Sequence, residues 1–373
     1  MILQTFSEYI KEGGNVQIET SDGLFGADRI DLGVVRRSVA VGLIGDTLSA
    51  INKEFQRSSG IPLWNSDLFL SNKFLSGSSY HFFQVSSIND DDFIKVKSTI
   101  GDIDLQCDTN QSEMIKTFLV KSTGKRIGNA TLIGFKESAG QLISLWNFQD
   151  MGINIQCDFE LVEFDRNGFP TAFSQYSHSS AWEDLTLGVK GVFSKFLMQS
   201  LAAPKFKKMI IKAKTSRGKD KILTRDTHAF SVSLGLREKM IPVKDTDGNI
   251  IYWDGVPEYK ELSTKESFGN TDMNFIFQYF FGIEPSAFEL KQISSFVGTI
   301  TLIKKNYERA SWIKIVDEFI DKIWGDGAQG LYRGNPQLDL DDKTKAARYI
   351  TAELGVDFDS YKSIIESYYK KYK

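Results

Sequence analysis

Cysteine and histidine are scarce in this 373-residue chain, which contains only two cysteines, Cys107 and Cys157, and three histidines. Two thiols do not make a disulfide framework, and these few widely separated residues match no Cys/His zinc motif. We therefore interpret both thiols as small buried side chains rather than nucleophiles. A reducing compartment, the cytoplasm, is the expected location.

Long hydrophobic runs and a strong net charge are also missing. No segment approaches the ~20 apolar residues of a membrane span. Residues 1–8 reach an acid too early for a signal peptide, so we expect no membrane association. The 45 basic and 48 acidic residues leave a formal charge of −3, which means that any surface for nucleic acid must be local.

Several familiar site motifs are absent as well. The Gly-Lys pairs that begin at Gly124 and Gly218 lack the earlier glycine and the following Ser or Thr of a P-loop. No Gly-x-Ser-x-Gly nucleophile motif is present. Counted from Asp245, a calcium-binding EF-hand would need glutamate where Val256 stands. What remains is a set of acidic residues downstream of a Gly-Ser turn.

Two carboxylates separated by one residue, Asp102 and Asp104, lie in a run typical of a β-strand. Alternate side chains of a strand point to the same face, so both carboxylates could bind the same divalent ions. Upstream, Gly77 lets the backbone approach a phosphate, and Ser78 and Ser79 offer donors to its oxygens. Together these residues predict a site for phosphoryl or nucleotidyl transfer.

A second acidic strand is predicted over residues 153–161, where apolar and polar residues alternate. Asp158 and Glu160 share its polar face, so either can supply a third acid; we favour Asp158. An acidic strand face is expected if it is exposed to solvent, or if it lines the same cleft as Asp102 and Asp104. The repeated Gln-Cys-Asp at 106–108 and 156–158 suggests that the two strands are neighbours.

The order of these motifs resembles the DNA polymerase beta-like nucleotidyltransferase superfamily, which includes poly(A) polymerases, CCA-adding enzymes and antibiotic nucleotidyltransferases. Its signature is a Gly-Ser turn, then an Asp-x-Asp strand, then a third acid on an adjacent strand. In this chain the matching residues are Gly77, Ser78, Asp102, Asp104 and Asp158. The resemblance covers residues 74–164. The gaps that separate the three motifs are longer than the family usually shows.

The resemblance implies transfer of a nucleoside monophosphate from an NTP, such as ATP, to an acceptor hydroxyl, with two Mg²⁺ or Mn²⁺ ions as cofactors. The catalytic and metal-binding residues would be Asp102, Asp104 and Asp158. The nucleotide-binding residues would be Gly77, Ser78, Ser79, Lys190 and Lys195. The composition, rich in Phe, Lys, Asp, Ser and Ile, suits a virus- or phage-encoded branch.

The expected fold is α+β: a mixed or antiparallel nucleotidyltransferase sheet with insertions over residues 1–203, then a mainly helical acceptor-binding domain over 204–373. Helical spacing of apolar residues predicts helices over 28–55, 274–281, 287–305, 312–324, 343–354 and 360–372. A capping-box pattern at 180–183 opens another predicted helix that ends near 202. Strand-like runs predict a hairpin of 82–85 with 93–96, and strands at 117–120, 130–135 and 142–148.

From Lys205 to Arg225 the chain holds nine basic residues and one acid, Asp220. A solvated surface explains such a run, and so does a track for phosphates; the second interpretation favours RNA or another polynucleotide as acceptor. A protein or small-molecule acceptor stays open. So do a catalytically silent nucleotidyltransferase-like binding module and a metal nuclease, the last less favoured because no lysine follows Glu160 in the usual place. The oligomeric state is not predicted.

Overall fold

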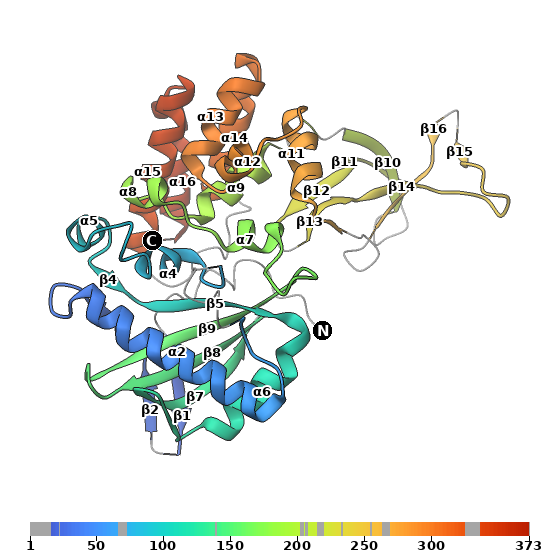
Figure 1. The fold of residues 1–373 in the computed structure, drawn as a ribbon. Helices are drawn as coiled ribbons and strands as arrows, with labels where there is room; N and C mark the ends of the chain where they lie inside the picture. The colour runs from blue at the N-terminus through green and yellow to red at the C-terminus, as the bar shows by residue number, and fades with distance from the viewer. Residues whose placement is uncertain are drawn as a thin grey trace. The chain divides into compact units, whose positions relative to one another are not determined.

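The computed structural model describes residues 16–21, 23–65, 73–138, 140–201, 205, 208–214, 220–232, 234–253, 256–262, 269–324 and 336–372. Its fold is mixed α+β, with a curled mixed sheet and a helical C-terminal region (Figure 1). The chain divides into two compact units, Met1–Gly191 with Gln329–Lys345, and Val192–Ala328 with Ala346–Lys373. The domain limits predicted from the sequence stay a prediction.

A five-stranded sheet forms the centre of the first unit, in the order β5-β9-β8-β7-β6 (Figure 1). Its strands are β5 (Asp102–Asp108), β6 (Arg126–Ile127), β7 (Ala130–Ser138), β8 (Gln141–Phe148) and β9 (Ile153–Val162). Strands β6 to β9 form an antiparallel meander, whereas β5 and β9 are parallel. The two acidic strands are therefore neighbours, which confirms the interpretation of the sequence echo.

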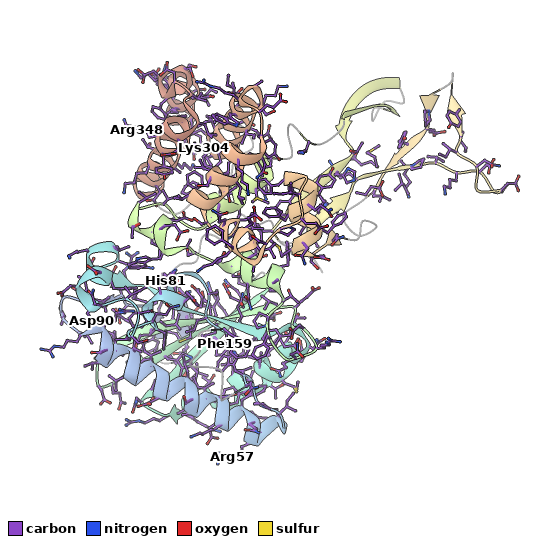
Figure 2. All side chains as sticks on the ribbon, turned by 45° about the horizontal axis from the view of Figure 1, so that its top comes forward. Arg57, His81, Asp90, Phe159, Lys304 and Arg348 are labelled. Carbon is purple, nitrogen blue, oxygen red and sulfur yellow. The ribbon has the colours of Figure 1, made fainter. Side chains whose placement is uncertain are left out.

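One face of this sheet packs against helices α2 (Arg37–Ser59) and α6 (Ser112–Ser122). Ile103 and Leu105 of β5 and Phe159 of β9 belong to the same buried apolar cluster as Ile44 and Leu48 of α2. Figure 2 shows Phe159 among the side chains that fill this unit. Because successive side chains of a strand alternate between faces, the acidic residues of both strands project from the opposite face.

The opposite face is covered in part by a hairpin of β1 (Gln17–Thr20) and β2 (Gly23–Gly26). Val16 and Ile18 pack there against Ile143 and Leu145 of β8. The polar positions of β5 and β9 lie outside this small cluster. They are contacted by residues of α4 (Gly77–Phe82) and α7 (Ala172–His178).

The connection from α4 to β5 consists of α5 (Asp90–Val96) and β4 (Thr99–Ile100), which pairs with β3 (Ile30–Asp31). Arg37 at the start of α2 fixes this connection. Its side chain is fully buried, donates to three backbone carbonyl oxygens within residues 81–88, and lies over the Phe93 ring. His81 of α4 and Asp90 of α5 are labelled in Figure 2.

Two predicted strand regions are wrong. In the hairpin predicted for 82–85 and 93–96, residue 82 ends α4, residues 83–85 are irregular, and residues 93–96 belong to α5. The strand predicted at 117–120 lies inside α6. Asn89 caps α5 by accepting the N–H of Asp92, and acidic residues in that first turn favour a helix. Short apolar runs fit the period of a strand as well as that of a helix. The Asn89 cap and the acidic first turn therefore favour the helix here.

Predicted helix limits differ in three places. The helix predicted over 28–55 begins only at Arg37. The helix predicted over 180–202 is divided into α8 (Trp182–Thr186) and α9 (Val192–Ser200), with Gly188 in a left-handed conformation between them. Ala181, not a capping-box serine, precedes α8. The predicted helix 287–305 is interrupted at residues 293–295.

The second unit is mainly helical and includes the C-terminal part of α15. Its helices are α9, α11 (Met273–Phe281), α12 (Ala287–Gln292), α13 (Phe296–Asn306), α14 (Arg309–Trp324), α15 (Pro336–Leu354) and α16 (Lys362–Tyr372). Phe319 of α14 contacts the rings of Phe193 and Phe296, so amphipathic faces of three helices meet in one core. The helices predicted at 274–281, 312–324, 343–354 and 360–372 are confirmed.

Short strands complete the second unit. They are β10 (Lys208–Lys214), β11 (Asp220–Asp226), β12 (His228–Ser231), β13 (Gly235–Glu238), β14 (Met240–Pro242), β15 (Tyr252–Trp253), β16 (Val256–Pro257), β17 (Tyr259–Glu261) and β18 (Gly269–Asn270). The basic segment forms the antiparallel pair β10–β11. Its side chains from residue 206 onward lie outside the described residues, so the predicted phosphate track stays a prediction. Within the described ranges no helix is both long and apolar enough to cross a bilayer.

Candidate metal centre

Three carboxylates meet where β5 and β9 run side by side. Asp104 is directly paired with Asp158 in the parallel register, and Asp102 lies two residues earlier on the same face of β5. One carboxylate oxygen from each of the three residues lies within 4.8 Å of the others. The structure therefore brings together the acids that the sequence predicted, in an arrangement that could bind a metal.

The electrostatics of this cluster favour a cation. Burial raises the pKa of Asp104 well above its ordinary value, and the charges of Asp102, Glu160 and Asp158 raise it further, while Lys97 opposes them. A divalent ion would offset this crowded negative charge. Carboxylate oxygens are the ligands that Mg²⁺ and Mn²⁺ prefer, so the residues present fit such an ion.

The other acid of β9, Glu160, has different partners. One oxygen of Glu160 lies 3.0 Å from Nδ1 of His178 on α7, and the other accepts the hydroxyl of Ser76 at 2.6 Å. Asp158 instead receives the side-chain amide of Gln156, whose Nε2 lies 2.9 Å from both carboxylate oxygens. The geometry therefore favours Asp158 over Glu160 as the third acid of the cluster.

Substituting these two acids separately should distinguish a ligand from a structural residue. We expect Asp158→Asn to weaken Mn²⁺ binding by about 100-fold or more, since even partners of ligands contribute about 10- to 100-fold. Glu160→Gln keeps an acceptor for Ser76 and should change the affinity by only a few-fold. Titration with Mn²⁺ followed by electron paramagnetic resonance measures both. Equal losses in the two variants would show that Glu160 is also a ligand.

The Gly77 turn lies against the cluster. Residues 74–76 run antiparallel to β5, with the Ser76 N–H donating to the Asp104 carbonyl at 3.2 Å. Gly77 has a left-handed φ of +53°, and a Cβ at this position would stand 2.6 Å from Oδ2 of Asp104. Only glycine combines this backbone conformation with so close an approach.

The two serines after Gly77 have different surroundings. Ser79 is fully buried, and its hydroxyl accepts the Asp104 N–H at 2.9 Å and donates to the Asp102 carbonyl at 3.4 Å. Ser79 thus fixes the turn on β5. Ser78 is only half-buried, and its hydroxyl accepts a hydrogen bond from the Lys97 ammonium.

Lys97 is a residue of the site that the sequence did not reveal. Burial lowers its pKa, while the charges of Asp102 and Asp104 raise it. It lies between α5 and β4 in no recognisable motif, so no local signal could have found it.

The two lysines predicted for nucleotide binding lie in different units. Lys190 belongs to the first unit, where it pairs with Asp342 at 2.9 Å and keeps a half-exposed side chain. Its charge is one of those that lower the pKa of Lys97. Lys195 lies on α9 of the second unit with a buried side chain. The role of each stays a prediction.

Both cysteines are confirmed as buried thiols. Cys107 of β5 and Cys157 of β9 point into the apolar cluster on the face opposite to the acids, and burial raises the pKa of each well above its ordinary value.

Comparison with protein-family models, with curated proteins and with solved structures gives no match, so inference about function starts from the geometry of this site.

Proposed function

We propose that this chain is a metal-dependent nucleotidyltransferase that moves a nucleoside monophosphate from an NTP to an acceptor hydroxyl and releases pyrophosphate. One observation supports this above all: a left-handed Gly-Ser turn lies against three carboxylates carried by two parallel strands. The same elements carry the resemblance to the DNA polymerase beta-like superfamily, and we propose that the chain belongs to it.

The donor set suits the metal ions of such an enzyme. Asp102, Asp104 and Asp158 would hold Mg²⁺ or Mn²⁺. Bound ions would stabilise negative charge on the transferred phosphoryl group and lower the pKa of the acceptor hydroxyl. Asp158, whose carboxylate is oriented by the Gln156 amide, would take the proton from that hydroxyl.

Groups beside the acids would hold the phosphates. The hydroxyl of Ser78 and the ammonium of Lys97 already form one hydrogen-bonded pair next to the cluster. A phosphate oxygen can accept from both groups, and charge-assisted hydrogen bonds of this kind are the stronger ones. The positive charge of Lys190 also acts on Lys97, whose pKa it lowers. For the acceptor we propose an RNA 3′ end, on the strength of the basic residues from Lys205 to Arg225.

The proposed activity can be tested without knowing the acceptor. The protein is incubated with Mg²⁺ and each α-labelled NTP in the presence of RNA, protein or small-molecule fractions. We expect label to enter one fraction, to disappear with a chelator, and not to enter from γ-labelled NTP, which would report a kinase. Bound NTP without incorporation into any fraction would contradict the proposal and favour a silent binding module.

Metal ions should stabilise the protein more at neutral than at acidic pH. The raised pKa of Asp104 means that the folded metal-free protein holds this proton more tightly than the unfolded chain does. Its stability therefore falls as pH rises above the ordinary carboxyl value of 3.8 toward the raised pKa. Metal competes with this proton, so deprotonation at higher pH favours metal binding.

The measurement is a thermal unfolding scan with and without Mn²⁺. At about 100 times its dissociation constant, a ligand adds about 2.7 kcal/mol, which raises the Tm by roughly 3 to 4 °C for a protein of 373 residues. We expect a rise of this order near neutral pH and a much smaller one at about pH 4. Equal rises at both pH values would argue that carboxylates do not bind the ion.

A further inference from the structure

Lys97 brings a positive charge to the acid cluster from a segment that carries none of the acids. Its backbone is fixed on both sides. The N–H of Lys97 donates to the Phe93 carbonyl at 2.7 Å, and the carbonyl of the next residue, Ser98, accepts the N–H of Leu32 at 2.9 Å. Backbone hydrogen bonds on both sides of Lys97 therefore hold the position from which its side chain extends.

The ammonium of Lys97 has two kinds of neighbour. Its Nζ donates to the hydroxyl of Ser78, in the turn proposed to hold phosphate. The carboxylates of Asp102 and Asp104 also act on it, and their negative charges favour the ammonium form. Lys97 thus contacts a group that would bind nucleotide and is attracted by the acids that would bind metal.

The charges of two other basic residues also act on Lys97. The charges of Arg29 and Lys190 both act on the Lys97 ammonium and disfavour it, although the first precedes β3 and the second follows α8. Like charges gathered from separate segments repel one another unless an anion lies between them. A polyphosphate is an anion that matches several cations at once.

A metal ion and the ammonium cannot both neutralise the same carboxylates without repelling each other. When a divalent ion binds Asp102 and Asp104, the attraction that holds the Lys97 ammonium there is replaced by repulsion. A phosphate that arrives with the ion offers the ammonium a new acceptor beside Ser78.

We propose that Lys97 couples metal binding to nucleotide binding: it neutralises Asp102 and Asp104 in the metal-free protein and moves to a phosphate of the NTP when metal and nucleotide enter together. This inference rests on the proposed function. It makes metal alone a weak ligand and makes metal with polyphosphate a strong one. Lys97 is then a residue that contacts substrate.

The test compares Lys97→Met with the wild type in two binding measurements. Affinity for Mn²⁺ alone is measured by electron paramagnetic resonance, and affinity for labelled inorganic tripolyphosphate in saturating Mn²⁺ by equilibrium dialysis. We expect the variant to bind Mn²⁺ alone about 5- to 10-fold more tightly, because a repelling charge is gone. It should bind tripolyphosphate at least about 10-fold more weakly, because a charged donor is gone.

Two further variants serve as controls for the opposite changes in affinity for Mn²⁺ and for tripolyphosphate. Lys97→Arg keeps the charge and should restore both affinities toward the wild type. Lys95→Met removes an exposed lysine of α5 that pairs with Asp92 at 3.3 Å, and should change neither. Should Lys97→Met fail to fold, Lys97→Gln has the same expected changes with a polar side chain.

The outcomes separate this inference from the proposed function. If the Lys97 variant loses affinity for Mn²⁺ and tripolyphosphate alike, Lys97 is a structural residue and the coupling is wrong. If neither affinity changes, the coupling is wrong and the metal centre stands. If the wild type binds no Mn²⁺, the metal centre and the coupling both fail.

Discussion

Replacing Asp104 by asparagine should abolish nucleotidyl transfer and at the same time make the metal-free protein more stable. Asp104 is central in the cluster, directly paired with Asp158 and two residues from Asp102. Because partners of metal ligands alone contribute about 10- to 100-fold, loss of a ligand should reduce transfer and Mn²⁺ affinity by more than about 100-fold. Asparagine keeps the shape of the side chain, so Ser79 and the β5 backbone are undisturbed.

The metal-free Asp104 variant should gain stability although it loses transfer. Burial and the neighbouring carboxylates raise the pKa of Asp104 well above its ordinary value, so an ionised Asp104 destabilises the folded metal-free protein at neutral pH. A neutral amide removes this cost. Thermal unfolding in a chelator measures it, with Asp46→Asn on the exposed side of α2 as a control that should change neither property. Full transfer by the Asp104 variant would overturn the assignment of the site.

Replacing Gly77 by alanine should damage the same site from the other side. The added methyl group would stand 2.6 Å from Oδ2 of Asp104, so the carboxylate or the turn must move. Alanine also disfavours the left-handed conformation by about 1–2 kcal/mol. We expect transfer and Mn²⁺ affinity to fall by about 10-fold or more, since small misplacements of catalytic groups are costly.

Gly152 supplies a matched control for this variant. It has a left-handed φ of +66° in the turn before β9, and a Cβ there would meet nothing within 4 Å. Gly152→Ala should therefore show the conformational cost of about 1–2 kcal/mol with unchanged Mn²⁺ affinity. If both variants lose the same stability and neither loses metal affinity, the Gly77 turn does not act on the acid cluster.

The acids could be predicted because the signals for them are local. Two carboxylates on alternate positions of one strand, and the alternating pattern of residues 153–161, follow from the period of a β-strand alone. The helices of the second unit were predicted for a similar reason, since their apolar stripes extend over several turns. Patterns that extend over a whole strand or several helical turns fit only one of the two periods, that of a strand or that of a helix.

The rest of the site depends on contacts that no short pattern contains. Lys97 reaches the cluster because Arg37 and the β3–β4 pair hold the α4 to β5 connection in place, and these contacts join residues far apart in the chain. The sequence predicts a hairpin of 82–85 with 93–96, where α5 stands instead of the second strand, because apolar runs of four residues fit either structure. The Asn89 cap was the signal that favoured a helix.

The parallel pairing of β5 with β9 has a consequence for folding. Three strands, β6 to β8, separate these two along the chain, so Asp158 meets Asp104 only when β9 has paired with a distant part of the chain. Contacts between such distant segments are slow to form because the intervening loop must close first. Binding of Mn²⁺ during refolding would thus report the pairing of β5 with β9.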